Sequence, residues 1–365
     1  MIITILIAFI SLIGLIILHE FGHFVLAKKF GIMVEEFGVG YPPRLFGKKF
    51  GETIYSLNLL PFGAFVKIHG EEGGIEDYRS FIGKPMRQRV LIVLGGVVSF
   101  WIIAIVILSI VAGVWGLPTA VGDEENHTLI DPKIQITAIA SDSPAKDAGL
   151  KVGDVISEIG FQQSFFKVNK TKEVQEFTEA HKGQEITLVI KRGEEAFDVK
   201  IVPRVSFPEG QAPIGIGLTR IALKPYPWYQ APLKGATASF LLTKNIVQGW
   251  LMGFKSLLGI TKLPEGVKME LMGPLGIFDL LREYFKLGIS YFLFLVSFIS
   301  VALALTNLLP IPSLDGGKLV FLTIEAIRKK PVNQKIEQSI TTAFFILLII
   351  LMIFVTIKFD IPRVF

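Results

Sequence analysis

Two histidines and a glutamate lie close together near the start of this 365-residue sequence, in the run His19-Glu20-Phe21-Gly22-His23. On a helix, residues four positions apart share one face, so both imidazoles can bind a single metal ion. Glu20 then lies beside that metal and can accept a proton from water that the metal activates. The alternative is a coincidence or a pair of structural histidines, but the chain has only five histidines. The spacing therefore favours a metal site with a general base.

The apolar sequence around this motif makes unpaired ionisable groups costly. Residues Met1 to Leu18 contain no charged side chain, and the apolar pattern continues to Phe30. An ionisable residue at mid-membrane costs roughly 2.5–3.5 kcal/mol on insertion scales and by default marks function. A helix over residues 2–29 would place both histidines below the membrane surface but short of its centre. A bound metal compensates for this cost.

A third ligand is expected far downstream, at Asp315. The chain has no cysteine, so nitrogen and oxygen atoms must hold any zinc, and a catalytic zinc takes three protein ligands and leaves one position open. Asp315 follows an uncharged run from Asn307 to Leu314 whose two prolines break a helix, and backbone freed in a membrane must face protein or water. Taken alone, a helix-capping role for Asp315 is an equally good interpretation. Together with the first motif and a shared side of the membrane, the ligand role is favoured.

Four apolar stretches approach or reach the ~20 residues that cross a bilayer. They are Met1–Phe30, Val90–Leu117, Leu287–Leu314 and Ile340–Ile357. A mean hydropathy of +0.56 agrees with a membrane protein. A cleaved signal peptide is the alternative for the first stretch, but no basic residue precedes Ile2 and no small-residue cleavage site follows Leu18. We expect four retained spans.

Lysine and arginine predict the orientation of these spans. Basic residues gather between the first and second stretches and between the third and fourth. Both segments should therefore be cytoplasmic, with the two termini and the long middle region outside. No Arg-rich or aromatic-interleaved patch indicates nucleic acid, so that class of partner is excluded. The expected location is the cytoplasmic membrane of a bacterium, with the lipid bilayer as a partner.

The resulting fold class is a polytopic α-helical membrane protein with an inserted α/β domain and a membrane-associated β-hairpin. We divide the chain into an N-terminal membrane core (1–130), a soluble module (131–205), an amphipathic connector (206–286) and a C-terminal membrane core (287–365). Alternation at Ile134–Ile139, Val155–Ile159, Ile186–Lys191 and Ala196–Val202 predicts strands in the module, and Val174–His181 predicts a helix. Residues Thr53–Ile68 predict strands broken at Pro61 and Gly63.

These motifs resemble the site-2 protease family, and within it the bacterial regulator-of-sigma-E protease subgroup. The resemblance rests on His19-Glu20-Phe21-Gly22-His23, on Asn307–Gly317 with its Leu-Asp-Gly core, and on a domain between the second and third spans. It implies a zinc endopeptidase that cuts transmembrane segments of single-span membrane proteins. Carried over by position, His19, His23 and Asp315 would bind Zn²⁺, Glu20 would be the general base, and Asn307 would hold substrate backbone.

Further segments fit the same family. Ser143-Pro144-Ala145 and the run from Ala148 to Ile156 resemble a PDZ domain of the bacterial protease type, and Thr53–Ile68 resembles the family's membrane-reentrant hairpin. An ordinary cytoplasmic hairpin is the alternative for Thr53–Ile68. Gly273-Pro274-Leu275-Gly276 also matches a family element.

The sequence also departs from the family. Only one PDZ-like domain is found, where members of that subgroup have two in tandem. Gly96 and Ser99 stand where the family often has Pro and Asn, so a role of that Asn in binding substrate is in doubt. His69, His127 and His181 are expected at the surface or at caps.

Three functions from different classes compete. Intramembrane proteolysis, on targets such as anti-sigma factors or remnant signal peptides, requires the intact metal motif. A non-catalytic adaptor that recruits partners through the PDZ-like domain has no reason to keep buried ionisable groups. A transporter is disfavoured, because no inverted repeat is evident and the ligands cluster near one membrane face. The sequence leaves the oligomeric state open.

Overall fold

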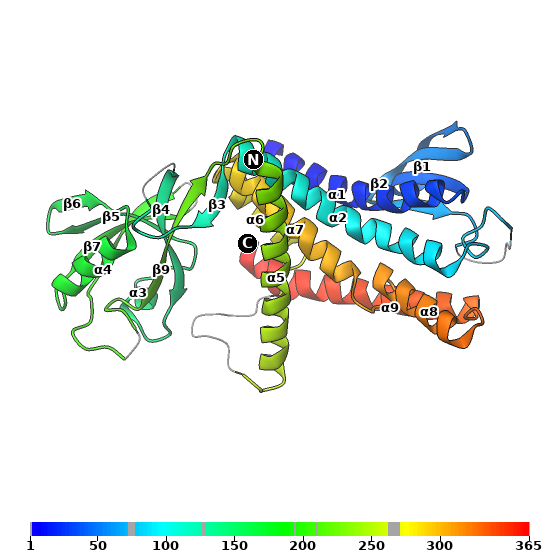
Figure 1. Ribbon diagram of the computed structural model, residues 1–365. Coiled ribbons are helices and arrows are strands. Elements are labelled where there is room, and N and C mark those ends of the chain that lie inside the picture. The colour runs from blue at the N-terminus through cyan, green and yellow to red at the C-terminus, as the bar shows by residue number, and fades with distance from the viewer. Residues whose placement is uncertain are drawn as a thin grey trace.

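The computed structural model describes residues 2–71, 77–125, 129–192, 195–208, 211–261 and 271–364. Four described helices are long and apolar enough to cross a membrane. They are α1 (Ile2–Lys29), α2 (Met86–Val114), α7 (Ile289–Asn307) and α9 (Gln334–Val355), which continues through η1 (Thr356–Asp360) into α10 (Ile361–Val364). They form one end of an elongated molecule, and a β-rich domain forms the other (Figure 1). His127 lies outside the described residues.

Three spans differ in their limits from the sequence expectation. Helix α2 begins at Met86 rather than Val90 and takes in Arg89, whose charge is paired with Glu325. Helix α7 ends at Asn307 rather than Leu314, because Pro310 and Pro312 interrupt the apolar run that follows. The last span begins at Gln334, where the side chain of the preceding Asn333 accepts a hydrogen bond from a backbone N–H.

The segment between α1 and α2 forms a long antiparallel pair, β1 (Val34–Phe50) and β2 (Thr53–Ile68). Residues 54–57 of β2 pair on one side with residues 46–49 of β1 and on the other side with residues 36–39 of β1. Residues 64–68 of β2 pair with residues 34–39 of β1. Only the second strand was expected from the sequence. The outward side chains of this sheet include exposed apolar residues, among them Tyr41, Leu45, Phe46, Phe50, Leu57 and Leu60. Exposed apolar area of this extent indicates contact with lipid or a partner.

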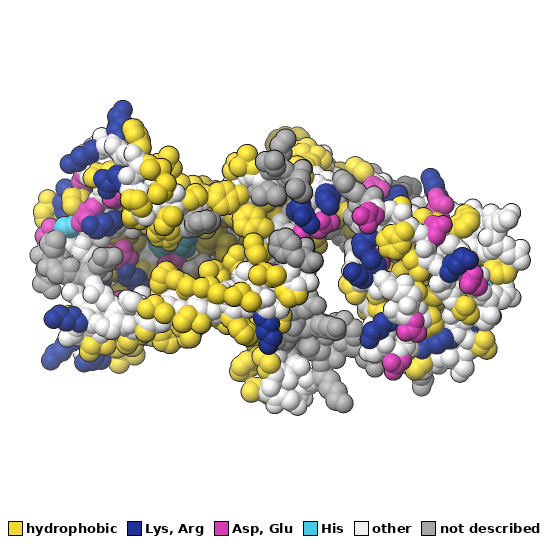
Figure 2. Space-filling model, turned by 180° about the vertical axis from the view of Figure 1, so that it is seen from behind, with side chains coloured by type: hydrophobic (Ala, Val, Ile, Leu, Met, Phe, Trp, Pro, Cys, Tyr) yellow, Lys and Arg dark blue, Asp and Glu magenta, His cyan; other side chains and the backbone are white. Residues whose placement is uncertain are grey.

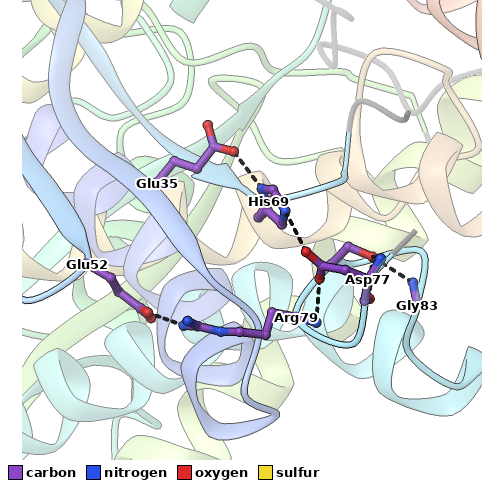
Figure 3. A network of polar contacts seen from close by, with 7 residues as sticks. Glu35, Glu52, His69, Asp77, Arg79 and Gly83 are labelled. Carbon is purple, nitrogen blue, oxygen red and sulfur yellow. Dashed lines mark hydrogen bonds and ion pairs between the residues drawn. The ribbon is translucent and has the colours of Figure 1, made fainter. Parts of the chain in front are cut away.

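His69 belongs to a polar network at the base of this sheet, shown in Figure 3. Its Nδ1 lies 2.8 Å from a Glu35 carboxylate oxygen and its Nε2 3.3 Å from Asp77. Arg79 continues the network to Glu52. His69 was expected at the surface or at a cap. The residue is only 9% exposed, so a surface position is wrong. Its backbone N–H donates to the carbonyl of Met33 and its carbonyl accepts from the N–H of Phe81, so His69 links the end of the sheet to the segment before α2.

The β-rich domain is a seven-stranded sheet in the order β3-β9-β4-β5-β7-β8, with β6 paired to β5. The strands are β3 (Leu117–Ala120), β4 (Ile130–Ile139), β5 (Val155–Phe161), β6 (Ser164–Lys167), β7 (Ile186–Arg192), β8 (Glu195–Ile201) and β9 (Ile216–Lys224). Helices α3 (Pro144–Asp147) and α4 (Thr171–Ala180) complete it. Its core contains Ile134, Ile136, Ile156, Leu188 and Ile190, all at most 1% exposed. The expected strands and helix are present, and His181 lies at the C-cap of α4 as expected.

Two strands of this sheet lie outside residues 131–205, the range expected for the module. β3 follows α2 directly and pairs with β9, which belongs to the segment expected as connector. The linker that follows β3, residues 121–125, reaches α4. There the Asp123 carboxylate accepts hydrogen bonds from the N–H groups of Thr171 and Lys172. The Arg220 side chain on β9 donates to carbonyls of the same linker. Sequence periodicity in short strands does not reveal such long-range pairing, so the boundaries differ.

Three helices complete the fold. Helix α5 (Ala231–Leu257) lies crosswise to the spans, and α6 (Pro274–Lys286) packs on α1 and α7 (Figure 1). At the start of α6, the N–H of Gly273 donates to the buried carboxylate of Asp360 at the end of the last span. Helix α8 (Asp315–Arg328) follows the proline break after α7 and packs chiefly on α2.

Candidate metal centre

His19 and His23 project from the same face of α1, as their spacing predicts. Their Nε2 atoms lie 3.4 Å apart, and both residues are 8% exposed. Helix α1 crosses α2 at very short range, since a Cβ on Gly22 would lie 2.3 Å from the backbone oxygen of Gly95. Only glycines permit two helices to approach so closely. This crossing brings α2 against both imidazoles.

Helix α2 fixes the orientation of the two rings. The carbonyl of Ile92 lies 2.9 Å from His23 Nδ1, which donates to it, so Nε2 remains free to face a metal. The His19 ring stacks on Phe100, with centroids 4.6 Å apart. Between these two supports, a Cβ on Gly96 would lie 2.1 Å from His23 Nε2. The site therefore depends on the absence of a side chain at Gly96.

Asp315 is brought to the histidines by the break between α7 and α8. Its Oδ2 lies 3.4 Å from Nε2 of His19 and 3.4 Å from Nε2 of His23. The three atoms thus form a nearly equilateral triangle. Ligands ~2.0–2.1 Å from a tetrahedral zinc lie ~3.3–3.4 Å from one another. The triangle has the dimensions of one face of such a tetrahedron.

The chemistry of the three donors also fits a metal ion. Asp315 Oδ2 is buried and has no hydrogen-bond partner among the described residues. A buried polar atom without a partner is costly, and a cation would satisfy it. Of the described residues, His19, His23 and Asp315 form the one group of three or more whose atoms could share an ion. Two imidazoles and a carboxylate are a ligand set that catalytic zinc uses.

Glu20 lies beside this triangle, and Asn307 lines the cavity onto which the triangle opens. A Glu20 carboxylate oxygen is 4.0 Å from His19 Nε2, and its side chain is 18% exposed. Asn307, at the end of α7, lines the same cavity, and its amide donates to the carbonyl of Leu303 at 3.0 Å. Glu20 is therefore within reach of a water beside the metal.

A cavity of about 870 Å³ opens from the metal site. Leu12 and Ile16 of α1 and Leu303 of α7 line its apolar part, and Glu71, Lys318 and Glu337 line a polar part near α8 and α9. Figure 2 shows this hollow between the apolar helices, with histidine and acidic side chains inside it. Such a space can hold an extended peptide next to water.

The supporting residues on α2 are what the sequence interpretation missed. Ile92 and Phe100 are apolar and carry no chemical signal of their own. Ser99, which stands where the family often has Asn, donates its hydroxyl to the carbonyl of Gly96 at 2.6 Å. The hydroxyl is therefore engaged within its own helix. The only available signal was that Gly95-Gly96 and Phe100 align with a family motif.

Fold and site together define a membrane-embedded metallopeptidase. A family model described as Peptidase family M50 matches residues 7–351. The chain belongs to this family of zinc metalloproteases, the site-2 proteases, and is a bacterial membrane protein.

Two relatives that match over nearly their whole length support this assignment. A Clostridium perfringens protein, provisionally named a zinc metalloprotease, is 33% identical over 353 residues, which are 96% of each chain. The regulator of sigma-W protease RasP of Bacillus subtilis is 28% identical and covers 98% of each chain. A solved PDZ domain of an SdrC-like protein from Listeria monocytogenes matches 23% of this chain and 85% of its own length, with 24% identity and a TM-score of 0.20.

Proposed function

We propose that this protein cleaves transmembrane segments of single-span membrane proteins, at a zinc ion held by His19, His23 and Asp315. The triangle of three donor atoms with 3.4 Å edges carries this proposal. Zinc, when bound, supplies the Lewis acid that polarises the scissile carbonyl and makes water a better nucleophile. Glu20 accepts the proton from the attacking water and passes it to the leaving amide nitrogen.

The surroundings of the site suit an extended substrate. Proteolysis needs an unwound peptide, and a free strand edge binds one through backbone hydrogen bonds. In the described sheet, residues 64–68 pair on one side only, and Ala64 of this strand lines the cavity. Substrate would add to that edge, while the Asn307 amide holds its backbone near the metal. Leu12, Ile16 and Leu303 would receive its apolar side chains.

The proposed orientation places the polar part of the cavity toward the cytoplasm. Lys28, Arg79 and Arg89 lie near one end of the spans, together with Lys318 and Lys330 beyond α7. The excess of positive charge on short loops marks the cytoplasmic side. The seven-stranded domain then lies outside. Water would reach the zinc from the cytoplasmic side, past Glu71 and Lys318.

A Glu20→Gln variant tests the proposal. It should keep its zinc and lose activity about 10²–10⁴-fold, because the amide cannot accept the proton. Zinc content is measured on purified full-length protein. Cleavage is followed by mass spectrometry of membranes that contain either wild type or the variant, since uncut single-span fragments should accumulate with the variant. Anti-sigma factors are the first substrates to test, because the Bacillus subtilis relative is named a regulator of sigma-W. Cleavage at the wild-type rate would contradict the proposal, and an adaptor function would then account better for the domain.

A further inference from the structure

The helix that carries Asp315 docks through a single stripe of side chains. Asp315, Lys318, Leu322 and Glu325 recur every three or four residues on α8 and therefore share one face. Lys318 pairs with Glu71. Leu322 is 5% exposed and packs in an apolar cluster of the neighbouring elements. Each member of the stripe after Asp315 thus fixes α8 to the rest of the protein.

Glu325 makes the most directional of these contacts, with Arg89 of α2. The guanidinium donates through Nη1 to one carboxylate oxygen at 3.0 Å and through Nη2 to the other at 2.5 Å. The side chains are 8% and 20% exposed. Charge-assisted pairs with two parallel hydrogen bonds fix both distance and orientation. The pair therefore resists both sliding and rotation of α8 against α2.

The same helix, α2, also holds the histidines. Arg89, Ile92 and Gly96 are spaced by three and four residues, so they share one face of α2. On this face Arg89 binds α8, the Ile92 carbonyl binds His23, and Gly96 lies against both imidazole rings. Glu325 is ten residues from Asp315, ~15 Å along a helix. One face of α2 thus contacts both histidines directly and, through Arg89, the helix that carries Asp315.

We infer that Arg89 and Glu325 are positioning residues for the metal centre: by locking α8 onto α2 they hold Asp315 at the distance from His19 and His23 that zinc requires. The inference rests on the proposed metal site. Neither residue touches the reacting atoms, so the pair acts on metal affinity through Asp315. An ion pair that only stabilised the fold would affect zinc binding whether or not Asp315 were present.

The test measures zinc affinity by chelator competition on the purified full-length protein. Arg89→Gln and Glu325→Gln should each weaken zinc binding about ten-fold or more, as loss of outer support for a metal ligand does. The double variant should be no weaker than either single variant, because the two residues act as one unit. Combined with Asp315→Ala, which itself weakens binding, Arg89→Gln should cause no further loss. Thermal unfolding of each variant checks that it is folded.

A matched control is the Arg192–Asp154 pair of the seven-stranded domain, which is also bidentate, with two contacts of 2.7 Å. Arg192→Gln should leave zinc affinity unchanged. The inference is overturned if Arg89→Gln binds zinc as tightly as wild type, or if it weakens binding equally with and without Asp315. A wild-type protein that binds no zinc would instead overturn the proposed function, and the positioning role with it.

Discussion

Asp315 in the membrane core and Asp154 in the seven-stranded domain are both carboxylates shielded by protein, but their surroundings differ. Both carboxylate oxygens of Asp154 accept hydrogen bonds from the Arg192 guanidinium, and one of them also accepts a hydrogen bond from the backbone N–H of Lys151. Asp315 Oδ2 faces two imidazole nitrogens and, within the described part of the chain, has no hydrogen-bond partner. A buried carboxylate whose oxygens have hydrogen-bond partners stabilises a fold. A carboxylate that instead faces two imidazole nitrogens can bind a cation together with them.

The largest expected effect is the loss of zinc affinity on substitution of Asp315, the carboxylate of the membrane core. Asp315→Asn removes the charge of one of the three proposed zinc ligands, so zinc affinity should fall at least a hundred-fold and proteolysis should be lost. The folding of the apoprotein should change little, because none of the residues that the structure describes makes a hydrogen bond to Asp315 Oδ2. Zinc content and thermal unfolding of purified protein measure the two effects. A variant that retains zinc at the wild-type level would remove Asp315 from the site.

A second variant adds one methyl group beside the imidazoles. Gly96→Ala would place a Cβ 2.1 Å from His23 Nε2, so the ring must move away from the metal position. Zinc affinity should fall about 10–100-fold, comparable to loss of an outer-shell support. Gly249→Ala is the control, since nothing lies within 4 Å of its added Cβ, and it should leave affinity unchanged. Equal affinities for the two variants would contradict the close packing of α2 on His23.

The third prediction concerns the other carboxylate. Asp154→Asn should destabilise the seven-stranded domain by about 2–3 kcal/mol. The substitution disrupts the charged hydrogen bonds between Arg192 and the Asp154 carboxylate, and Asp154 is only 1% exposed. Zinc affinity should not change. Hydrogen exchange of β5 and β7 in the full-length protein reports the stability of this domain. If zinc binding fell together with stability, the two regions would be coupled and the comparison would fail.

The smallest effect should come from His69, a histidine with a carboxylate at each ring nitrogen. The hydrogen bond to Glu35 raises the pKa of His69, and the Asp77 carboxylate acts in the same direction. Burial acts in the opposite direction, but it does not reverse the upward shift of the His69 pKa. The protonated ring therefore stabilises the base of the hairpin fully below the unfolded pKa of ~6.5, and this contribution is lost as pH rises through the higher folded value.

Hydrogen exchange tests this sign. From about pH 6 to about pH 9, the amide of Phe81, which donates to the His69 carbonyl, should lose protection after correction for intrinsic exchange. A His69→Gln variant should show no such pH dependence. Protection that increases with pH, or that changes equally in the variant, would contradict the network as described.

Much of this molecule could be predicted from local sequence. The i, i+4 spacing of His19 and His23 fixes their common face, because helix geometry is local. The apolar stretches predicted the four spans, and alternation predicted β4, β5, β7 and β8. The limits of the spans were less accurate, because the charge of Arg89 within α2 is paired with a residue of α8 that lies far away in the sequence. The strand β1 was missed, since its prolines and glycines obscure the alternation.

The sequence by itself determined which groups can do the chemistry: two imidazoles, a carboxylate and a neighbouring base in an apolar chain without cysteine. Only the tertiary structure decided how these groups are held. The 3.4 Å triangle, the Ile92 carbonyl on His23, the space left by Gly96 and the Arg89–Glu325 pair all join residues distant in sequence. Chemical capacity depends on residue type, which a sequence states directly, whereas position depends on packing between helices, which no local pattern contains.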